Sequence, residues 1–147
     1  MEDISDNLER FVGEQLQEYN ECDEMVFEAQ RYLSFKNAPK SLFKVSTHKL
    51  AEAGFFYVPN RSSSDTVQCA FCGTMLGSWE PNDDPWTEHR EHTKTNAMRK
   101  GVNCPFVSLG KAEREMTVKE LRDIIKARFD LILENLRNDI VNFIANM

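Results

Sequence analysis

The chain has 147 residues, of which 41% are hydrophobic, and its formal net charge is −6. This length and composition suit one compact domain with an additional helix or tail, and they exclude a disordered chain. The charge is uneven, because residues 1–30 contain ten acidic residues and one basic residue, whereas the remainder has a net charge of +3. So weak a positive charge does not indicate direct nucleic-acid binding, and no apolar run approaches the ~18 residues of a membrane span.

The first segment, residues 1–24, is an acidic leader in which Leu8, Phe11, Val12, Leu16 and Tyr19 follow helical spacing. This pattern predicts a short amphipathic helix. Residues 1–10 are acidic and polar, unlike a secretory signal or a transit peptide. We therefore expect a reducing compartment, where a Cys-x-x-Cys pair indicates metal or redox chemistry before a disulfide.

The middle segment, residues 25–112, holds nearly all of the Cys, His, Pro, Gly and Trp residues and is the expected globular unit. Its pattern predicts, in chain order, a helix over residues 25–35, a break at Pro39, a short helix over 47–53 that ends at Gly54, strands over 55–58, 66–71 and 74–79, and a helix that begins at Pro85. The Cys72-Gly73 pair between the last two strands indicates a tight corner.

Four residues of this segment have the spacing of a zinc site, Cys69-x₂-Cys72-x₁₆-His89-x₁₄-Cys104. Two cysteines at a tight turn can present both thiolates to one ion, and a helical His with a distant fourth Cys completes a tetrahedron. Because a Cys₃His set leaves no open position for water, it is typical of structural zinc. We expect one structural Zn²⁺ that supports folding, and no enzymatic activity.

Other interpretations of these residues stay open at the level of sequence. The Cys-x-x-Cys pair occurs in thioredoxin-like redox proteins, although no βαβ pattern surrounds it here. The cysteines could also be ordinary core residues, or Cys104 could be a nucleophile with His92 as its base. His92 lies one helical turn from His89, so it competes with Cys104 as the fourth ligand. The gaps of a nucleic-acid-binding finger differ from those found here, which favours Cys104.

Five motifs make the middle segment recognisable: Arg31-Tyr-Leu-Ser-Phe35-Lys-Asn37, Leu50-Ala-Glu-Ala-Gly54-Phe55, Gln68-Cys69-x-x-Cys72, Trp79-Glu80-Pro81-Asn82-Asp83-Asp84-Pro85-Trp86-Thr87-Glu88-His89, and Cys104-Pro105-Phe106. Together they resemble the baculoviral inhibitor-of-apoptosis repeat, or BIR, family. A single repeat followed by a long helix is similar to the survivin branch in particular. The resemblance implies an α+β fold, with a three-stranded antiparallel sheet, short helices and one zinc ion. The gap of fourteen residues between His89 and Cys104 is longer than usual for the family, which indicates an insertion near residues 94–101.

The resemblance also implies a groove that binds peptides with a free N-terminal Ala, added along the third strand. Asp83 is expected to pair with the peptide ammonium, Trp79 to form an apolar wall, and His92 to match a phosphate-contacting His. Survivin-like proteins read a histone tail whose third residue can be phosphothreonine. Thr74 stands at a groove position where Lys is common, and Gly77 where an acid is common, so phosphate should contribute less here. Helix capping by Asp83, a core role for Trp79 and a solvated face for His92 are the alternatives.

The last segment, residues 113–147, predicts a helix of about 45 Å that starts with the capping box Thr117-Val-Lys-Glu120. Apolar residues recur along it at spacings of three and four, and the expected partner face contains Leu121, Ile125, Phe129, Ile132 and Leu136. Packing on its own domain, or a homodimer, is the alternative. In survivin-like proteins this helix joins borealin and the inner centromere protein, which connects it to Aurora kinase.

We therefore expect a subunit of the chromosomal passenger complex that acts in mitosis and occupies the cytoplasm, the nucleus, the centromere and the spindle. The alternative within the family is an apoptosis inhibitor that binds caspases or their Ala-terminal antagonists. A zinc-dependent hydrolase, the third possibility, would need an open metal position, which the Cys₃His set does not provide.

Overall fold

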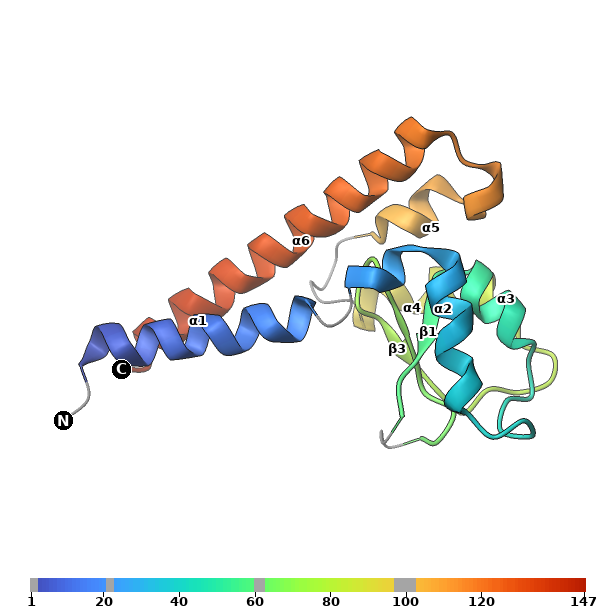
Figure 1. Ribbon diagram of the computed structural model, residues 1–147, viewed down its shortest axis with the longest axis horizontal. Helices are drawn as coiled ribbons and strands as arrows, with labels where there is room; N and C mark the ends of the chain where they lie inside the picture. The colour runs from blue at the N-terminus through green and yellow to red at the C-terminus, as the bar shows by residue number, and fades with distance from the viewer. Residues whose placement is uncertain (1–2, 21–22, 60–62, 97–102) are drawn as a thin grey trace.

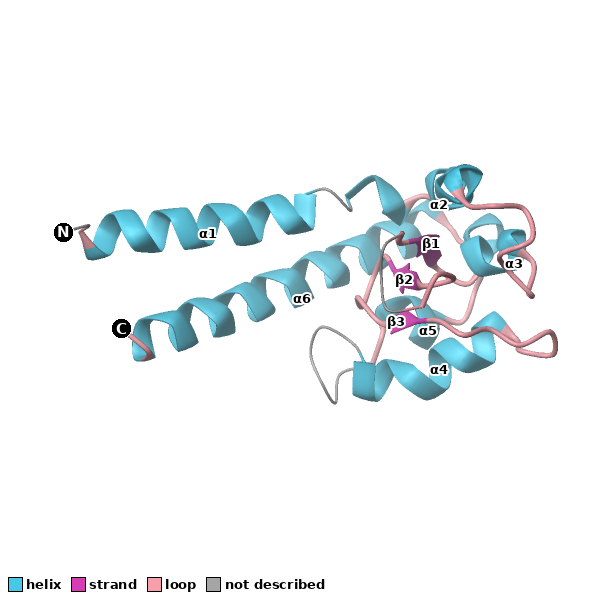
Figure 2. Ribbon diagram, turned by 90° about the horizontal axis from the view of Figure 1, so that it is seen from below, coloured by secondary structure: helices cyan, strands magenta, loops and turns pink. Residues whose placement is uncertain are grey.

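The structure is a computed structural model that describes residues 3–20, 23–59, 63–96 and 103–147. A small mixed domain forms one end of the molecule, and two long helices, α1 (Ile4–Asn20) and α6 (Val118–Ala145), extend away from it (Figures 1 and 2). These helices run antiparallel and bring the two chain ends close together. Within the described ranges, no helix has the length and apolarity to cross a bilayer.

The three strands form one antiparallel sheet in the order β1 (Phe55–Tyr57), β2 (Val67–Cys69) and β3 (Met75–Leu76). This confirms the expected sheet, although every strand is shorter than predicted. The second strand stops at Cys69 because the chain turns there to form the Cys-x-x-Cys corner, with Gly73 at φ 77°. The third strand ends before Ser78, whose φ of 57° is incompatible with extended pairing.

The single helix predicted over residues 25–35 was wrong over its first three residues and its last one. The structure has a 3₁₀ turn, η1 (Asp23–Val26), then α2 (Glu28–Ser34) and a second turn, η2 (Phe35–Asn37). Between the first two, Phe27 is extended, with φ −98° and ψ 131°. The Glu28 amide donates to the side chain of Glu113, 85 residues away, so a tertiary contact sets the start of α2.

The other short helices follow their sequence signals. Helix α3 (Thr47–Glu52) ends at Gly54, whose φ of 99° favours glycine. A Cβ at Gly54 would also lie 3.1 Å from the Phe106 ring, so this position has little room. Helix α4 (Pro85–Asn96) begins at Pro85 as predicted. The expected insertion at residues 94–101 extends α4 as far as Asn96, and the rest of it lies outside the described residues.

Two elements after the insertion connect the domain to the last helix. Helix α5 (Pro105–Leu109) was not predicted, and it ends at Gly110 in the left-handed conformation. After the turn η3 (Glu113–Glu115), helix α6 begins with the predicted capping box between Thr117 and Glu120. The first half of α6 packs on the domain, where Ile124 belongs to the hydrophobic core.

Candidate metal centre and peptide groove

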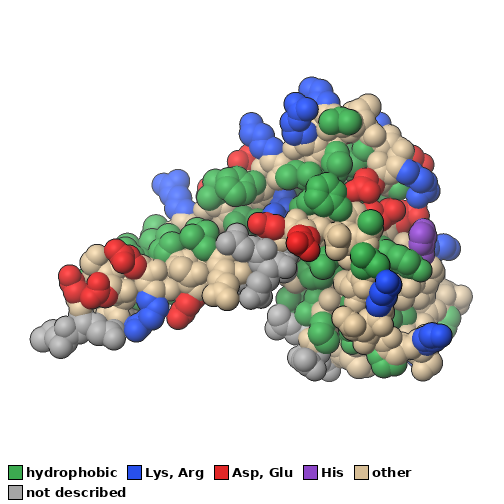
Figure 3. Space-filling view, viewed as in Figure 1, with side chains coloured by type: hydrophobic (Ala, Val, Ile, Leu, Met, Phe, Trp, Pro, Cys, Tyr) green, Lys and Arg blue, Asp and Glu red, His purple; other side chains and the backbone are tan. Residues whose placement is uncertain are grey.

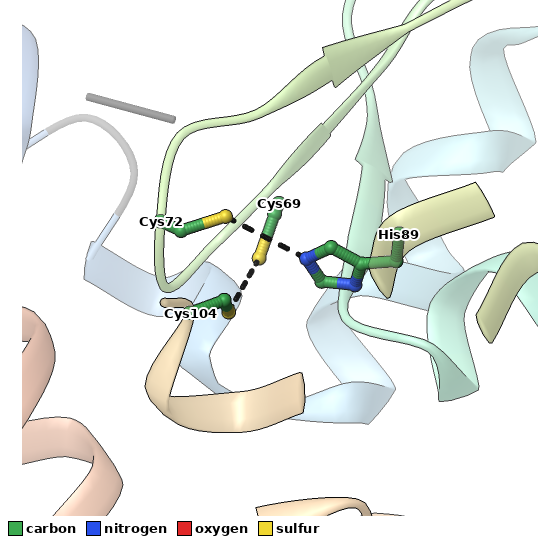
Figure 4. Close-up of side chains that lie close together, drawn as sticks. All are labelled: Cys69, Cys72, His89 and Cys104. Atoms are coloured by element: carbon green, nitrogen blue, oxygen red, sulfur yellow. Dashed lines mark hydrogen bonds between the residues drawn. The ribbon is translucent and has the colours of Figure 1, made fainter. Parts of the chain in front are cut away.

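The four predicted zinc ligands converge in the interior of the domain (Figure 4). The corner after β2 supplies Cys69 and Cys72, α4 supplies His89, and Cys104 precedes α5. Each side chain is buried, and all four ligand atoms lie within 4.8 Å of one another.

The distances within this group fit a tetrahedral zinc ion. The Cys69 and Cys104 sulfurs are 3.8 Å apart, and the Cys72 sulfur is 3.6 Å from His89 Nε2. Zn–S bonds of ~2.3 Å arranged tetrahedrally would separate two sulfurs by about 3.8 Å. The group could therefore hold one structural zinc ion, and it contains Cys104 rather than His92.

A backbone contact orients the histidine of the group. His89 Nδ1 lies 2.8 Å from the carbonyl oxygen of Ala53, to which it donates. This hydrogen bond places the ring proton on Nδ1, so the Nε2 lone pair faces the sulfurs. The position of Ala53 at the end of α3 thus selects the tautomer that binds metal.

Hydroxyl and amide groups surround the sulfurs. Thr93 Oγ1 donates to the Cys72 sulfur at 3.3 Å, and Thr74 Oγ1 lies 3.1 Å from the same atom. The Phe71 amide donates to the Cys69 sulfur at 3.3 Å. Thr74, which was expected in the peptide groove, therefore has its fully buried side chain beside the metal ligands instead.

The thiols of the group differ in acidity. Burial opposes ionisation of Cys69, but hydrogen bonds from Cys104, from Cys72 and from backbone amides together lower its pKa well below the ordinary value. Burial raises the pKa of Cys104 well above the ordinary value, and its hydrogen bond to Cys69 adds to the rise. The surroundings therefore favour the thiolate form of Cys69.

A buried cation lies next to this group. The Arg31 side chain is fully buried, and it donates to the carbonyl oxygens of Met25, Val26 and Ala51. Its guanidinium lies 5.5 Å from the Phe106 ring centroid. Burial lowers the pKa of Arg31, and the charge of Cys69 opposes that change. Because zinc with three thiolates carries a net negative charge, a neighbouring cation stabilises it.

A groove of about 290 Å³ opens on the surface where β3 ends. Its lining residues are Leu76, Gly77, Ser78, Trp79, Glu80, Asp83, Glu88 and His92. Three of them are carboxylates, so the groove offers a negative environment to a cation. Three of the residues predicted from the sequence, Trp79, Asp83 and His92, thus lie together in this groove.

The polar atoms of the groove are only partly used by the protein. One Asp83 oxygen accepts from the Glu80 amide at 2.8 Å, and His92 Nδ1 lies 2.9 Å from the Glu88 carbonyl oxygen. The Trp79 indole N–H is buried and, among the described residues, has no hydrogen-bond partner. Because Trp79 is only 3% exposed and belongs to the hydrophobic core, it forms the inner apolar wall of the groove.

Asp65 shapes the strand end that forms the groove. Its carboxylate accepts from the amides of Ser78 and Trp79 at 2.7 and 2.9 Å, and from the Ser63 hydroxyl at 2.7 Å. Burial opposes its ionisation, but these hydrogen bonds lower the pKa of Asp65 below the ordinary value. The loop lies so close that a Cβ at Gly77 would meet the Ser63 Cβ at 2.9 Å. Gly77 therefore stands where the loop leaves no space for an acidic side chain.

Comparison with known proteins places this fold and site in a family. Residues 31–108, about half of the chain, match the sequence profile described as "BIR: Inhibitor of Apoptosis domain". The chain belongs to the BIR family. It is 34% identical over 106 residues to Baculoviral IAP repeat-containing protein 5 of Rattus norvegicus, an alignment that covers 71% of this chain and 69% of that protein.

A second relative confirms that this BIR protein is of the survivin type. The chain is 34% identical over 119 residues to Baculoviral IAP repeat-containing protein 5.2 of Xenopus tropicalis, an alignment that covers 80% of this chain and 71% of the relative. A solved structure titled "Crystal structure of DIAP1 BIR1 bound to a Grim peptide" is similar with a TM-score of 0.45 and 24% identity, covering 69% of this chain and 92% of that one.

The predicted partner face of α6 is divided in this BIR protein. Phe129 is exposed, whereas Ile132 and Leu136 are buried. Leu121 and Ile125 are half-buried and pack against the core. Of the five residues predicted for this face, Phe129 is therefore the one that is exposed to another protein, and its neighbour Leu133, outside the predicted face, is exposed as well.

Three residues that support the site were missed by the sequence analysis. Asp65 and Thr93 act through contacts with distant parts of the chain, so no local pattern marks them. Arg128 lies in α6, is 5% exposed, and donates to the Ala70 carbonyl oxygen within the Cys-x-x-Cys corner at 2.7 Å. An Arg in line with buried apolar positions is the one signal that could have revealed it.

Proposed function

We propose that this BIR protein is a non-enzymatic scaffold whose groove reads peptides that begin with a free N-terminal Ala, including a histone tail. The observation that carries the proposal is the juxtaposition, in one groove, of three carboxylates with an apolar wall formed by Trp79 and Leu76. A peptide that begins with Ala supplies both complements, an ammonium group for the carboxylates and a methyl group for the apolar wall.

The position of the groove supports this binding mode. It lies where β3 forms the edge of the sheet, since β3 pairs only with β2 in the strand order. An extended peptide can add to such an edge through main-chain hydrogen bonds. Trp79 and Leu76 line the groove as apolar groups, which suits the methyl side chain of a first Ala.

Phosphothreonine at the third peptide position is expected to contribute little. A phosphate needs cationic partners, and Thr74 is buried beside Cys72 rather than in the groove. His92 is the one basic side chain among the lining residues, and Glu88 lies within 3.6 Å of it. Recognition should therefore depend on the amino terminus more than on the phosphate.

We infer from the relatives that the scaffold works in the chromosomal passenger complex. In this proposal residues 25–112 read the peptide, residues 113–147 bind helices of borealin and the inner centromere protein, and Aurora kinase is reached indirectly. The protein would then occupy the cytoplasm and nucleus, and the centromere and spindle in mitosis. The relatives of the survivin type support this role.

The peptide proposal is tested by calorimetric titration of the zinc-loaded chain with a peptide that begins with Ala. Acetylating the peptide amino terminus removes the ammonium and should weaken binding at least tenfold. Asp83→Asn should weaken binding of the free peptide, whereas Asp84→Asn is the matched control, because Asp84 lies outside the groove and Asn caps helices as well as Asp does. Equal affinity for the free and acetylated peptides would contradict the proposal.

The description of the matching family, Inhibitor of Apoptosis domain, supports a second candidate. In that case the same groove would bind Ala-terminal antagonists of apoptosis inhibitors, and the chain would inhibit caspases. Two experiments separate the candidates: a caspase assay with the purified protein, and affinity purification from mitotic cells followed by mass spectrometry. Recovery of borealin and the inner centromere protein without caspase inhibition would support the passenger role.

A further inference from the structure

Helix α1 covers the far half of α6, where the proposed function requires access for partner helices. The ring of Phe11 stacks on that of Phe143 with centroids 4.4 Å apart and an interplanar angle of 11°. Both helices rise 1.5 Å per residue, so this antiparallel pair places Gln15 level with about residue 139. Helix α1 thus lies along the last turns of α6 (Figure 2).

The burial pattern shows which faces meet. On α1 the half-buried residues are Asn7, Leu8, Phe11, Val12 and Gln15, which recur every three to four positions. On the far half of α6, the half-buried residues Glu134, Asn135, Asp139, Ile140 and Phe143 recur in the same way. Each helix therefore presents one stripe to the other, as two helices of a bundle do.

The contact is incomplete, since no side chain over residues 3–17 is buried. Ile4 and Leu16 of α1 remain exposed, as do Phe129, Leu133, Val141 and Ile144 of α6. Figure 3 shows apolar side chains along α6, with Lys and Arg side chains projecting from its outer edge. The apolar surface of α6 is wider than the surface that α1 covers, so a better-matched helix would gain more.

The sequence of α1 also weakens the helix. Gly13 lies in its interior on an exposed position, and a Cβ there would meet nothing within 4 Å. Sterics therefore do not require glycine, which lowers helix stability relative to alanine. In proteins most of the stability of a helix comes from the packing of its apolar face rather than from propensity, so α1 depends on its contact with α6 for its order.

We propose that α1 occupies in cis a helix-binding face of α6, and that an acidic amphipathic helix of a partner protein displaces it. The partner is acidic because it takes the place of α1, which carries four acidic residues and one basic residue. A second copy of α6 does not share this composition, because α6 has five acidic and five basic residues. That a partner uses this face rests on the proposed function, whereas occupation by α1 does not.

The test uses the full zinc-loaded chain and a fluorescein-labelled peptide of residues 3–20 as the probe. Leu8→Glu with Phe11→Glu in the chain releases its own α1, so this variant should bind the peptide at least tenfold more tightly than the unaltered chain does. Ser5→Glu with Gln17→Glu adds the same charge at exposed positions and should behave like the unaltered chain. Gly13→Ala should strengthen the cis contact and weaken peptide binding by up to about fivefold.

Each result is decisive for the cis contact. Equal peptide binding by the unaltered chain and the Leu8/Phe11 variant, or no binding by either, would overturn it. The cis contact would also be overturned if light scattering found that the unaltered chain is a dimer and the Leu8/Phe11 variant is a monomer, because α1 would then pack on a second copy of the chain. Affinity of the groove for the Ala-terminal peptide, measured in the same samples, reports separately on the proposed function.

Discussion

Arg128 connects the zinc corner to α6, and its removal should destabilise the whole chain. The informative change is Arg128→Met, which keeps the packing of the side-chain stem while it removes the guanidinium. Two contacts are lost: the hydrogen bond to the Ala70 carbonyl oxygen at 2.7 Å, and the ion pair with Asp23 at 3.0 Å.

The magnitude follows from the burial of each contact. A buried carbonyl that loses a charged donor costs ~1.5–3 kcal/mol. Asp23 is more than half exposed, so its ion pair contributes at most ~0.5 kcal/mol. The free energy of unfolding should fall by ~2–3 kcal/mol, which for a chain of this length lowers Tm by roughly 5–10 °C.

Urea unfolding of the zinc-loaded protein, followed by circular dichroism, measures this change. Arg122→Met is the matched control on an exposed position of α6, and it should stay within ~0.5 kcal/mol of the unaltered chain. Asp23→Asn should also cost little. Because Ala70 lies between two zinc ligands, Arg128→Met should further accelerate zinc release to a chelator. A stability equal to that of Arg122→Met would refute the reasoning.

Two further predictions concern the metal group and the groove. Elemental analysis should find one zinc per chain. Cys104→Ser should lose the zinc and unfold the domain, because metal binding and folding are linked, whereas His92→Ala should keep it. Zinc retained in Cys104→Ser and lost in His92→Ala would show that His92, not Cys104, is the fourth ligand. Hydrogen bonds hold the pKa of Asp65 in the folded protein below the ordinary value. The ionised carboxylate therefore stabilises the fold fully at pH values above ~4, the pKa of Asp in the unfolded chain, and this stabilisation is lost as the pH falls through the lower pKa of the folded state. Urea unfolding between pH 7 and pH 3 should therefore show that the unaltered chain exceeds Asp65→Asn in its free energy of unfolding by a constant amount above about pH 5, and by less in acid. A difference in free energy that stays constant down to pH 3 would contradict the role of the carboxylate.

Local signals in the sequence determined the zinc-ligand set and the starts of two helices. The spacing of Cys69, Cys72, His89 and Cys104 is informative because a turn and a helix present their side chains in set directions, and zinc accepts few ligand sets. The capping box at Thr117 and the proline at the start of α4 act within one helical turn, so both helix starts were predicted correctly. The helical spacing of apolar residues in the leader likewise predicted α1.

Only the tertiary structure decided which surfaces remain accessible. A helical stripe in the sequence shows that a face is apolar, but it does not show what covers that face. Ile132 and Leu136 proved to be buried, while Phe129 stayed exposed. Thr74 lies beside the zinc group rather than in the groove, because its fully buried side chain contacts the Cys72 sulfur. Asp65, Arg128 and the α1–α6 pair depend on contacts between distant segments, which have no local sequence period and arise only when the chain folds.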